Sequence, residues 1–215
     1  MSNSMSHQVQ FHCERPRLHR LRAGDSAVTT DANLSPSRAP RIAFQGALGA
    51  YSEMAAARFG VPAPYPTFAA VCAATLAGEV ELGVLPVSNN IAGDVPEARA
   101  LLRSRALRLL DEFWLPIEHC LLGLPGATVA DATHILSHWQ ALRQCANVFE
   151  RHAWLRPTTV YDTAGAAKLI RARGRRNLLA IASRRAAAHY QLSVLAENIA
   201  DRADNATCFV LFQAR

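Results

Sequence analysis

Short apolar runs that alternate with helical segments constrain the fold of this chain more than any other feature of its sequence. Residues 41–45, 82–87, 178–182 and 208–212 are mostly apolar and partly β-branched or aromatic, as buried strands are. The segments between them contain strong helix formers, and several begin at a Ser, Thr or Asp and end at a glycine. Such alternation favours parallel strands with helices on the faces of the sheet. The sequence therefore predicts an α/β fold.

The length of the chain and a change of composition near residue 40 predict its organisation. A chain of 215 residues, of which 50% are apolar, is long enough for one domain of two lobes with a sizeable core. Residues 1–39 show no sustained hydrophobic period, and we predict a disordered leader there. The folded domain is then predicted to comprise residues 40–215.

Pro116 divides a long, mostly apolar segment and marks the predicted passage from one lobe to the other. Residues 107–124 are too long for one ordinary strand, and proline removes a hydrogen bond from a strand ladder. We therefore expect two strands here, the second of which enters another lobe. The first lobe is predicted at about residues 40–115 and 190–215, and the second at about residues 116–189.

The charge balance indicates which partners the chain can have. There are 23 Lys and Arg against 17 Asp and Glu, a net charge of +6, which suits nucleic acid or an acidic small molecule. The densest basic cluster, at residues 171–176, has no aromatic side chains within it, so it is interpreted as a solvated face. We therefore expect a small acidic ligand and no nucleic-acid partner.

The cysteines and histidines show no metal-binding or disulfide pattern. The five cysteines are an odd number and none have Cys-x-x-Cys spacing, which predicts reduced thiols in the cytoplasm and no zinc site. The eight histidines never form a His-Glu-x-x-His pair. No apolar run approaches the length of a membrane span, and the N-terminal region lacks the apolar segment of a secretory signal.

Polar clusters follow several of the predicted strands, at residues 46–52, 88–90, 137–138 and 162–163. Ligands of open α/β sheets bind at the carboxyl ends of strands, so the recurrence of these clusters favours one shared cleft. Each cluster taken by itself is equally consistent with a hydrophilic turn.

This pattern indicates three individual candidate residues for the cleft, which are Tyr51, Ser52 and Thr207. Tyr51 and Ser52 lie near the start of a predicted helix, where backbone N–H groups and the helix dipole favour anions. Thr207 enters the final apolar strand and so belongs at the edge of the sheet. On this stretch alone Thr207 is also explained as an ordinary strand threonine.

The motifs in their order resemble the catalytic domain of prephenate dehydratase over about residues 41–213. Each motif alone is weak, and the specificity comes from their complete series. The matching stretches are Gln45-Gly-Ala-Leu-Gly-Ala-Tyr-Ser-Glu53, Gly83-Val-Leu-Pro-Val87 followed by Asn89, Ser137-His-x-Gln-Ala-Leu-x-Gln-Cys145, Thr163-Ala-x-Ala-Ala167, Ala180-Ile-Ala-Ser183, Asn198-Ile-x-Asp201 and Asn205-x-Thr-x-Phe209.

The resemblance implies a fold, a site and an activity. The fold is two-lobed, like type II periplasmic binding proteins, with the active site in the cleft between the lobes. The activity is conversion of prephenate to phenylpyruvate without a cofactor or metal, commonly in a homodimer. The chain ends after this domain, so the regulatory ACT domain is expected to be absent. The implied catalytic residues are Thr207, Asn89, Ser137 and Gln144, and the substrate-binding residues are Tyr51, Ser52, Ser88, Asn90, Thr163, Cys208 and Phe209.

Two departures from the family pattern leave the reaction open. Ser88 stands where the family usually has Glu, and Cys208 where it usually has Arg. Loss of the Arg removes a fixed cation, so we expect weaker dehydration and an improvement in a Cys208→Arg variant. A carboxylate without a salt bridge also loses CO₂ more readily. The alternatives to a dehydratase are therefore a non-aromatising prephenate decarboxylase and a non-catalytic small-molecule binder.

Overall fold

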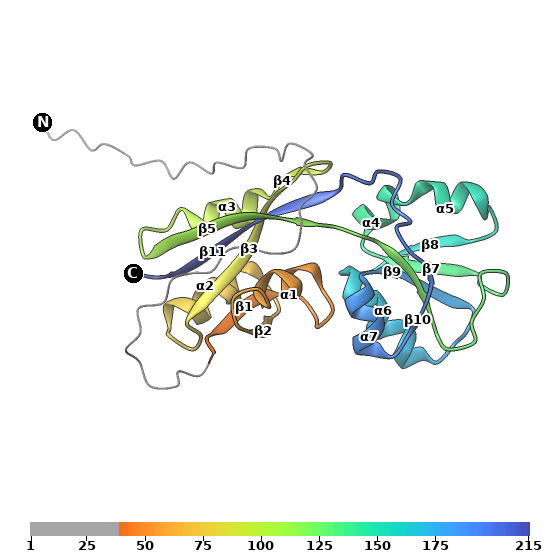
Figure 1. The fold of residues 1–215 in the computed structure, drawn as a ribbon, viewed down its shortest axis with the longest axis horizontal. Helices are drawn as coiled ribbons and strands as arrows, with labels where there is room; N and C mark the ends of the chain where they lie inside the picture. The colour runs from red at the N-terminus through yellow and green to blue at the C-terminus, as the bar shows by residue number, and fades with distance from the viewer. Residues whose placement is uncertain (1–38) are drawn as a thin grey trace, which may run out of the picture.

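The computed structural model describes residues 39–215, which form two α/β lobes side by side (Figure 1). The predicted leader lies outside the described residues, apart from Ala39 at its end. Each lobe is built on one sheet: the strand order is β2-β1-β3-β11-β5 in the first, with β4 on β3, and β10-β6-β9-β7-β8 in the second. The predicted two-lobed α/β class is therefore confirmed.

The first lobe combines three helices with strands from both ends of the described chain. Its strands β1, β2 and β3 are parallel neighbours, and β11 joins β3 and β5 as an antiparallel partner. Its elements are β1 (Arg41–Gln45), α1 (Tyr51–Ala56), β2 (Val61–Tyr65), α2 (Phe68–Leu76), β3 (Leu82–Asn89), β4 (Gly93–Asp94), α3 (Pro96–Leu102), β5 (Leu107–Pro116) and β11 (Ala206–Ala214).

The second lobe is a continuous stretch of the chain. Strands β7, β8 and β9 run parallel, whereas β6 pairs antiparallel with β9 and β10. Its elements are β6 (Cys120–Gly123), β7 (His134–Ser137), α4 (Trp139–Gln144), α5 (Ala146–Arg151), β8 (Arg156–Thr159), α6 (Thr163–Arg173), β9 (Leu178–Ala182), α7 (Arg184–Tyr190) and β10 (Ser193–Ala196).

Side-chain caps start the helices where the sequence predicts them. The hydroxyl of Thr67 accepts a hydrogen bond from Ala70 N at 3.0 Å, and Ser183 accepts one from Ala186 N at 3.0 Å. Asp162 caps α6 in the same way. These oxygens satisfy backbone N–H groups that have no partner within the helix. Because the caps follow strand ends, they fix where each helix begins beside the sheet edge.

The two faces of the first sheet carry different cores, and β11 contributes to both. Cys208, Val210 and Phe212 pack in the cluster under α2 and α3, whereas Phe209 and Leu211 pack in the cluster beside α1. Successive side chains of a strand point to opposite faces, which accounts for this division. The same alternation decides which residues of β11 line the cavity between the lobes that is described below.

Two segments cross between the lobes and lie side by side (Figure 1). Ile117 N donates to Asn205 O at 2.9 Å, and Ile199 N donates to His119 O at 3.0 Å. The outward crossing, residues 117–119, follows Pro116 at the end of β5. The predicted return at about residue 190 is wrong, because β10 still pairs with β6 in the second sheet. The return crossing, residues 197–205, begins only after Ala196 at the end of β10.

Direct contacts also join the lobes beside the crossing segments. Arg185 Nη2 of α7 lies 2.7 Å from Glu53 Oε1 of α1, and the Ser183 hydroxyl donates to Gly49 O at 2.6 Å. Gly49 has a φ of +89°, and a side-chain carbon there would lie 2.6 Å from Ala186 Cα. A glycine is therefore needed for this approach of the lobes. Among the helices of residues 39–215, none is long and apolar enough to span a membrane.

Candidate active site

A cavity of about 170 Å³ lies between the lobes and is lined by both of them. It adjoins a larger hollow of about 470 Å³, with which it shares Tyr51, Asn89 and Thr207. Together these spaces are called the inter-lobe cleft below. The lining side chains of the smaller cavity come from α1, the ends of β3 and β11, the outward crossing, α4 and the start of α6.

Thr207 and Asn89 face each other across the β3–β11 pair at the cleft. They are register partners, and Asn89 Nδ2 donates to Thr207 Oγ at 3.0 Å. A hydroxyl that accepts this bond keeps its own hydrogen for another acceptor. Asn89 is 8% exposed. While its Nδ2 donates to Thr207, its Oδ1 accepts from Ile91 N and Ala92 N at 3.0 and 2.8 Å, so both ends of the amide are held.

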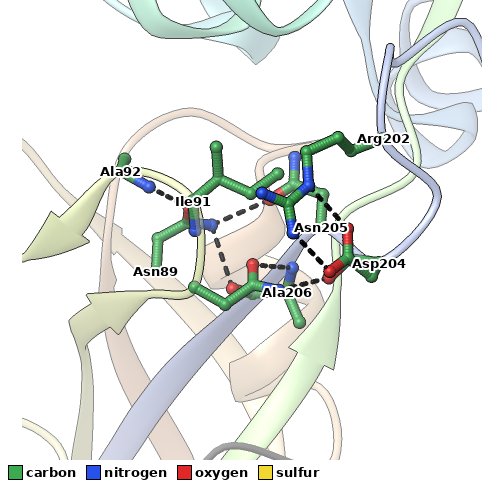
Figure 2. A network of polar contacts seen from close by, with 8 residues as sticks. Asn89, Ile91, Ala92, Arg202, Asp204, Asn205 and Ala206 are labelled. Carbon is green, nitrogen blue, oxygen red and sulfur yellow. Dashed lines mark hydrogen bonds and ion pairs between the residues drawn. The ribbon is translucent and has the colours of Figure 1, made fainter. Parts of the chain in front are cut away.

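The amide of Asn89 continues into a longer network. Figure 2 shows Asn89 between the backbone of Ile91 and Ala92 on one side and Asn205 on the other. Asn89 Nδ2 lies 2.9 Å from Asn205 Oδ1, and Asn205 Nδ2 lies 3.0 Å from Gln144 Oε1. The network therefore connects the strand ends of the first lobe to α4 of the second.

His119 of the outward crossing completes this network on the other side of Gln144. Its Nε2 lies 3.1 Å from Gln144 Oε1, and its Nδ1 lies 3.0 Å from the hydroxyl of Tyr51. Burial lowers the pKa of His119, and the hydrogen bond with Gln144 only partly opposes that shift. The ring is therefore neutral near pH 7. Burial also raises the pKa of Tyr51 well above its usual range, so the phenol stays protonated.

Gln144 is held by its backbone as well as by its side chain. Asp201 N of the return crossing donates to Gln144 O at 2.7 Å. The carboxylate of Asp201 accepts from Ala146 N and Asn147 N, at 2.8 and 3.0 Å, and so caps α5. This cap lies where the helical stretch of residues 139–151 is divided at Cys145 into α4 and α5. The division places Gln144 at a helix end beside the cleft.

Seven of the residues predicted for the site line the inter-lobe cleft. They come from separate parts of the sequence, and the two lobes bring them together. They are Thr207, Asn89, Gln144, Tyr51, Ser52, Thr163 and Phe209.

Ser88 and Cys208 were predicted to bind substrate, but the structure turns them away from the cleft. They are register partners on β3 and β11, one position before Asn89 and one after Thr207. Strand alternation therefore directs them to the α3 face of the sheet. Cys208 is 1% exposed in the core cluster there, and the Ser88 hydroxyl donates to Asp94 Oδ1 at 3.1 Å.

Ser137 and Asn90 are likewise placed outside the lining of the inter-lobe cleft. Ser137 is fully buried, and its hydroxyl donates to Ile181 O at 2.7 Å on the neighbouring strand β9. Asn90 Nδ2 donates to Asp204 O, and its Oδ1 accepts from Ala206 N at 2.8 Å. Both side chains thus bond to backbone and support the strand ends. A catalytic role for Ser137 and a binding role for Asn90 do not follow from these positions.

His119 and Asn205 belong to the site but were not among the predicted residues. His119 is 2% exposed and Asn205 is 3% exposed. The available signal for His119 was a polar residue inside an apolar segment directly after Pro116. The available signal for Asn205 was its position in the final motif, two residues before Thr207. Sequence spacing alone does not reveal that the two side chains meet at Gln144.

The inter-lobe cleft offers hydrogen-bond donors, while cations lie in a neighbouring cavity. No Lys or Arg of the described chain is among its lining residues. A separate cavity of about 360 Å³ shares Gln140 and Gln144 with the cleft and is lined by Arg143 and Arg202. Arg202 is paired with Asp204, at 2.6 Å, whereas Arg143 lies 5.9 Å from the Trp139 ring. Within residues 39–215, no group of three His, Cys, Asp or Glu side chains is placed to hold a metal ion.

Comparison with known proteins gives consistent matches. The family model of prephenate dehydratase matches residues 42–215. A bifunctional N-acyl-homoserine lactone acylase/prephenate dehydratase of Komagataeibacter europaeus is 41% identical over 177 residues, which are 81% of this chain and 63% of that protein. Arogenate dehydratase/prephenate dehydratase 1 of Arabidopsis thaliana is 37% identical over 207 residues, which are 94% of this chain and 52% of that protein.

A solved structure has the same fold. The prephenate dehydratase of Arthrobacter aurescens in complex with L-Phe superposes with a TM-score of 0.74 at 26% identity, over 81% of this chain and 60% of that one. This chain therefore spans between about half and two thirds of the length of the proteins it matches.

Proposed function

This chain belongs to the prephenate dehydratase family, and we propose that it converts prephenate to phenylpyruvate with loss of water and CO₂. Prephenate is a dianion built on a cyclohexadiene ring. One ring carbon carries a carboxylate and a pyruvyl arm, and the opposite carbon carries a hydroxyl. Loss of CO₂ supplies the electron pair that makes the ring aromatic while the hydroxyl leaves. Aromatisation drives the reaction, so the chemistry itself requires no cofactor.

The observation that carries the proposal is the hydrogen bond from Asn89 to Thr207 in the inter-lobe cleft. Because Thr207 Oγ accepts from Asn89, its hydrogen is directed to a different acceptor. The departing hydroxyl of prephenate is such an acceptor: it leaves with the electron pair of its C–O bond, the threonine hydrogen bond stabilises its negative charge, and solvent supplies the proton that makes it water. Threonine is a weak acid, so most of its effect comes from holding the donor in place.

The other donors of the site suit an anionic substrate that loses one of its charges as CO₂. Gln144 provides a neutral amide donor, which holds an oxygen without the strong pairing that would stabilise the reacting carboxylate. Arg143 lines the adjoining cavity, and we propose that its guanidinium receives the carboxylate of the pyruvyl arm. In this proposal the ring carboxylate is lost in the inter-lobe cleft, and the carboxylate of the pyruvyl arm is bound in the adjoining cavity.

A product assay with matched variants tests this proposal. The protein, Thr207→Ser and Thr207→Ala are incubated with prephenate and with its aminated relative arogenate, at neutral to alkaline pH because prephenate aromatises spontaneously in acid. We expect protein-dependent phenylpyruvate from prephenate, activity within about tenfold in Thr207→Ser, and a loss of about 10²–10⁴-fold in Thr207→Ala. Phenylalanine formed only from arogenate would correct the substrate, and full activity in Thr207→Ala would contradict the role of the hydroxyl.

Non-aromatising decarboxylation is the second candidate, since it was suggested by the residues at positions 88 and 208. Both side chains lie on the α3 face and not in the cleft, so these replacements support it less than the sequence suggested. The same assay separates the two reactions. A non-aromatic keto acid that keeps its hydroxyl would identify a decarboxylase, and binding without any product would identify a binder.

We also propose a homodimer in the cytoplasm. The dimer is supported by the family resemblance, and the location by the four cysteines of the described chain, which are buried and form no disulfide. Light scattering on the purified full chain gives the mass in solution. A monomer at all concentrations would contradict the dimer.

A further inference from the structure

We propose that His119 is a positioning residue. A one-way chain of hydrogen bonds ends at Gln144 Oε1, and His119 donates to the same oxygen from the opposite side. Together they turn the Gln144 amide so that Nε2 is the donor offered to the ligand. The chain begins at the backbone N–H groups of Ile91 and Ala92 and passes through Asn89 and Asn205. The direction of the chain follows from the protein alone, and its effect on catalysis rests on the proposed function.

The direction is set where the chain begins. Asn89 receives two hydrogen bonds from backbone N–H groups, those of Ile91 and Ala92, at 3.0 and 2.8 Å. A backbone N–H can only donate, so the atom that faces both groups is the oxygen of Asn89. Its Nδ2 group therefore faces the other way, toward Asn205 and Thr207. A reversed amide would place the Nδ2 donor of Asn89 against the N–H donors of Ile91 and Ala92.

The same reasoning passes the direction on to Gln144. Asn205 presents Oδ1 to Asn89 Nδ2 at 2.9 Å, and so it presents Nδ2 to Gln144 at 3.0 Å. The atom of Gln144 that meets this donor is Oε1. Asn205 is buried, so water does not compete for these contacts. A reversed Gln144 would place Nε2 against the Asn205 donor.

His119 fixes the Gln144 oxygen from the opposite side. Its Nε2 lies 3.1 Å from Oε1, which has no hydrogen to give, so the imidazole hydrogen is on Nε2. In the neutral ring Nδ1 is then an acceptor, and it lies 3.0 Å from the Tyr51 hydroxyl. The Tyr51 hydroxyl has a single hydrogen, for which His119 Nδ1 competes with Glu118 O at 2.7 Å. His119 thus holds one cleft residue from each lobe.

The consequence is a buried donor that has no partner in the protein. Gln144 Oε1 receives two hydrogen bonds, whereas Nε2 is buried and has no hydrogen-bond partner within the described residues. An unpaired buried donor is unfavourable, so a bound ligand that supplies an oxygen acceptor is favoured. Gln144 lines both the inter-lobe cleft and the cavity of Arg143. Because the amide of Gln144 is turned with Nε2 unpaired, the site favours a ligand that places an acceptor oxygen beside Nε2.

The proposal is tested first on the unmodified protein by nitrogen NMR of the histidine rings at pH 7.5. We expect the His119 ring to be neutral, with its hydrogen on Nε2. Assignment comes from the signal lost in His119→Gln. A ring with its hydrogen on Nδ1 would overturn the direction of the chain. This outcome does not depend on which substrate the protein turns over, so a failure of the proposed function leaves the test intact.

The second test compares two amide replacements of His119. The amide of Gln reaches the position of Nε2 and keeps the donor to Gln144, whereas the amide of Asn reaches only the position of Nδ1. We expect kcat on prephenate to stay within about threefold in His119→Gln and to fall by about tenfold or more in His119→Asn, the change for one lost hydrogen bond. The melting temperatures of both variants are measured alongside. Equal kcat in the two variants, at equal stability, would overturn the positioning role.

Discussion

Asn89 and Thr207 are register partners of β3 and β11, and Asn89 Nδ2 lies 3.0 Å from Thr207 Oγ. The pair brings together residues 118 positions apart in the sequence, at the edge of the first sheet that faces the second lobe. The bond decides the direction of the threonine hydroxyl. A strand pairing, which is a structural feature, thereby determines what the hydroxyl can do chemically.

An Asn89→Asp variant reverses this bond without changing the size of the side chain. One carboxylate oxygen still accepts from Ile91 N and Ala92 N, while the other now faces Thr207 Oγ as an acceptor. The threonine hydrogen is then drawn to the introduced carboxylate and away from the substrate. We expect a loss of kcat of about 10²-fold or more, measured as phenylpyruvate formation at constant pH.

Asn90→Asp is the matched control for that variant. It adds the same charge one residue along, at an amide that bonds to the backbone of Asp204 and of Ala206, the first residue of β11. An equal loss of kcat in both variants would show that added charge, and not the reversed bond, is responsible.

Cys208→Arg is expected to destabilise the protein and not to improve dehydration. Cys208 is 1% exposed among apolar side chains on the α3 face, so an arginine there would bury a cation in the core. Such burial costs several kcal/mol, and we expect the free energy of unfolding to fall by about 3 kcal/mol or more. Urea denaturation measures it. Gln213→Arg, at the half-buried end of the same strand, is the control and should change it by less than about 1 kcal/mol.

The ion pair of Glu53 and Arg185 predicts a pH dependence of stability. Burial alone would raise the pKa of Glu53, but hydrogen bonds from Arg185 and from Gly49 N outweigh it and hold the pKa below the usual value. A lowered folded-state pKa contributes stability above the unfolded-state pKa, about 4.3 for Glu, and this contribution is lost as the pH falls through the folded-state pKa.

We therefore expect Glu53→Gln to be less stable than the wild type at pH 7 and to approach it below about pH 4. Denaturant unfolding of both proteins between pH 7 and pH 3 gives the difference. A difference that stays constant over this range would mean that the Glu53 carboxylate gains nothing from Arg185. Glu150→Gln, on the exposed surface of α5, controls for general effects of acid.

Arg143 is expected to act on substrate binding more than on the chemical step. It lines the cavity that adjoins the cleft, and its position suits the remote carboxylate of the substrate. Arg143→Ala should raise KM about tenfold, as for loss of one charge-assisted hydrogen bond, and change kcat by less than about threefold. Arg151→Ala, an exposed arginine at the end of α5, serves as the control. A KM unchanged in Arg143→Ala would place the carboxylate elsewhere.

Much of the local structure was predictable because it depends on residues that are close in the sequence. The caps at Thr67, Asp162 and Ser183, and the passage between lobes at Pro116, follow from local chemistry. The short strand β10 was missed because its apolar run is brief, and the predicted lobe boundary moved with it.

The orientation of Cys208 was also within reach of the sequence. Thr207 and Phe209 both line the cleft, so the residue between them lies on the other face of β11. The resemblance grouped all three residues as site residues, and the alternation of the strand separates them. The same rule places Ser88 opposite to Asn89 on β3.

Most of the strands and helices, several helix caps, the presence of two lobes and the family were readable from the order of the residues, because they depend on local propensity, hydrophobic period and ordered motifs. The folded structure was needed to show that Asn205 meets Gln144 across 61 residues and that Arg185 meets Glu53 across 132 residues. It also brought His119 into the site. These contacts depend on how the lobes pack against each other, and no short-range pattern encodes the distance between side chains on different lobes.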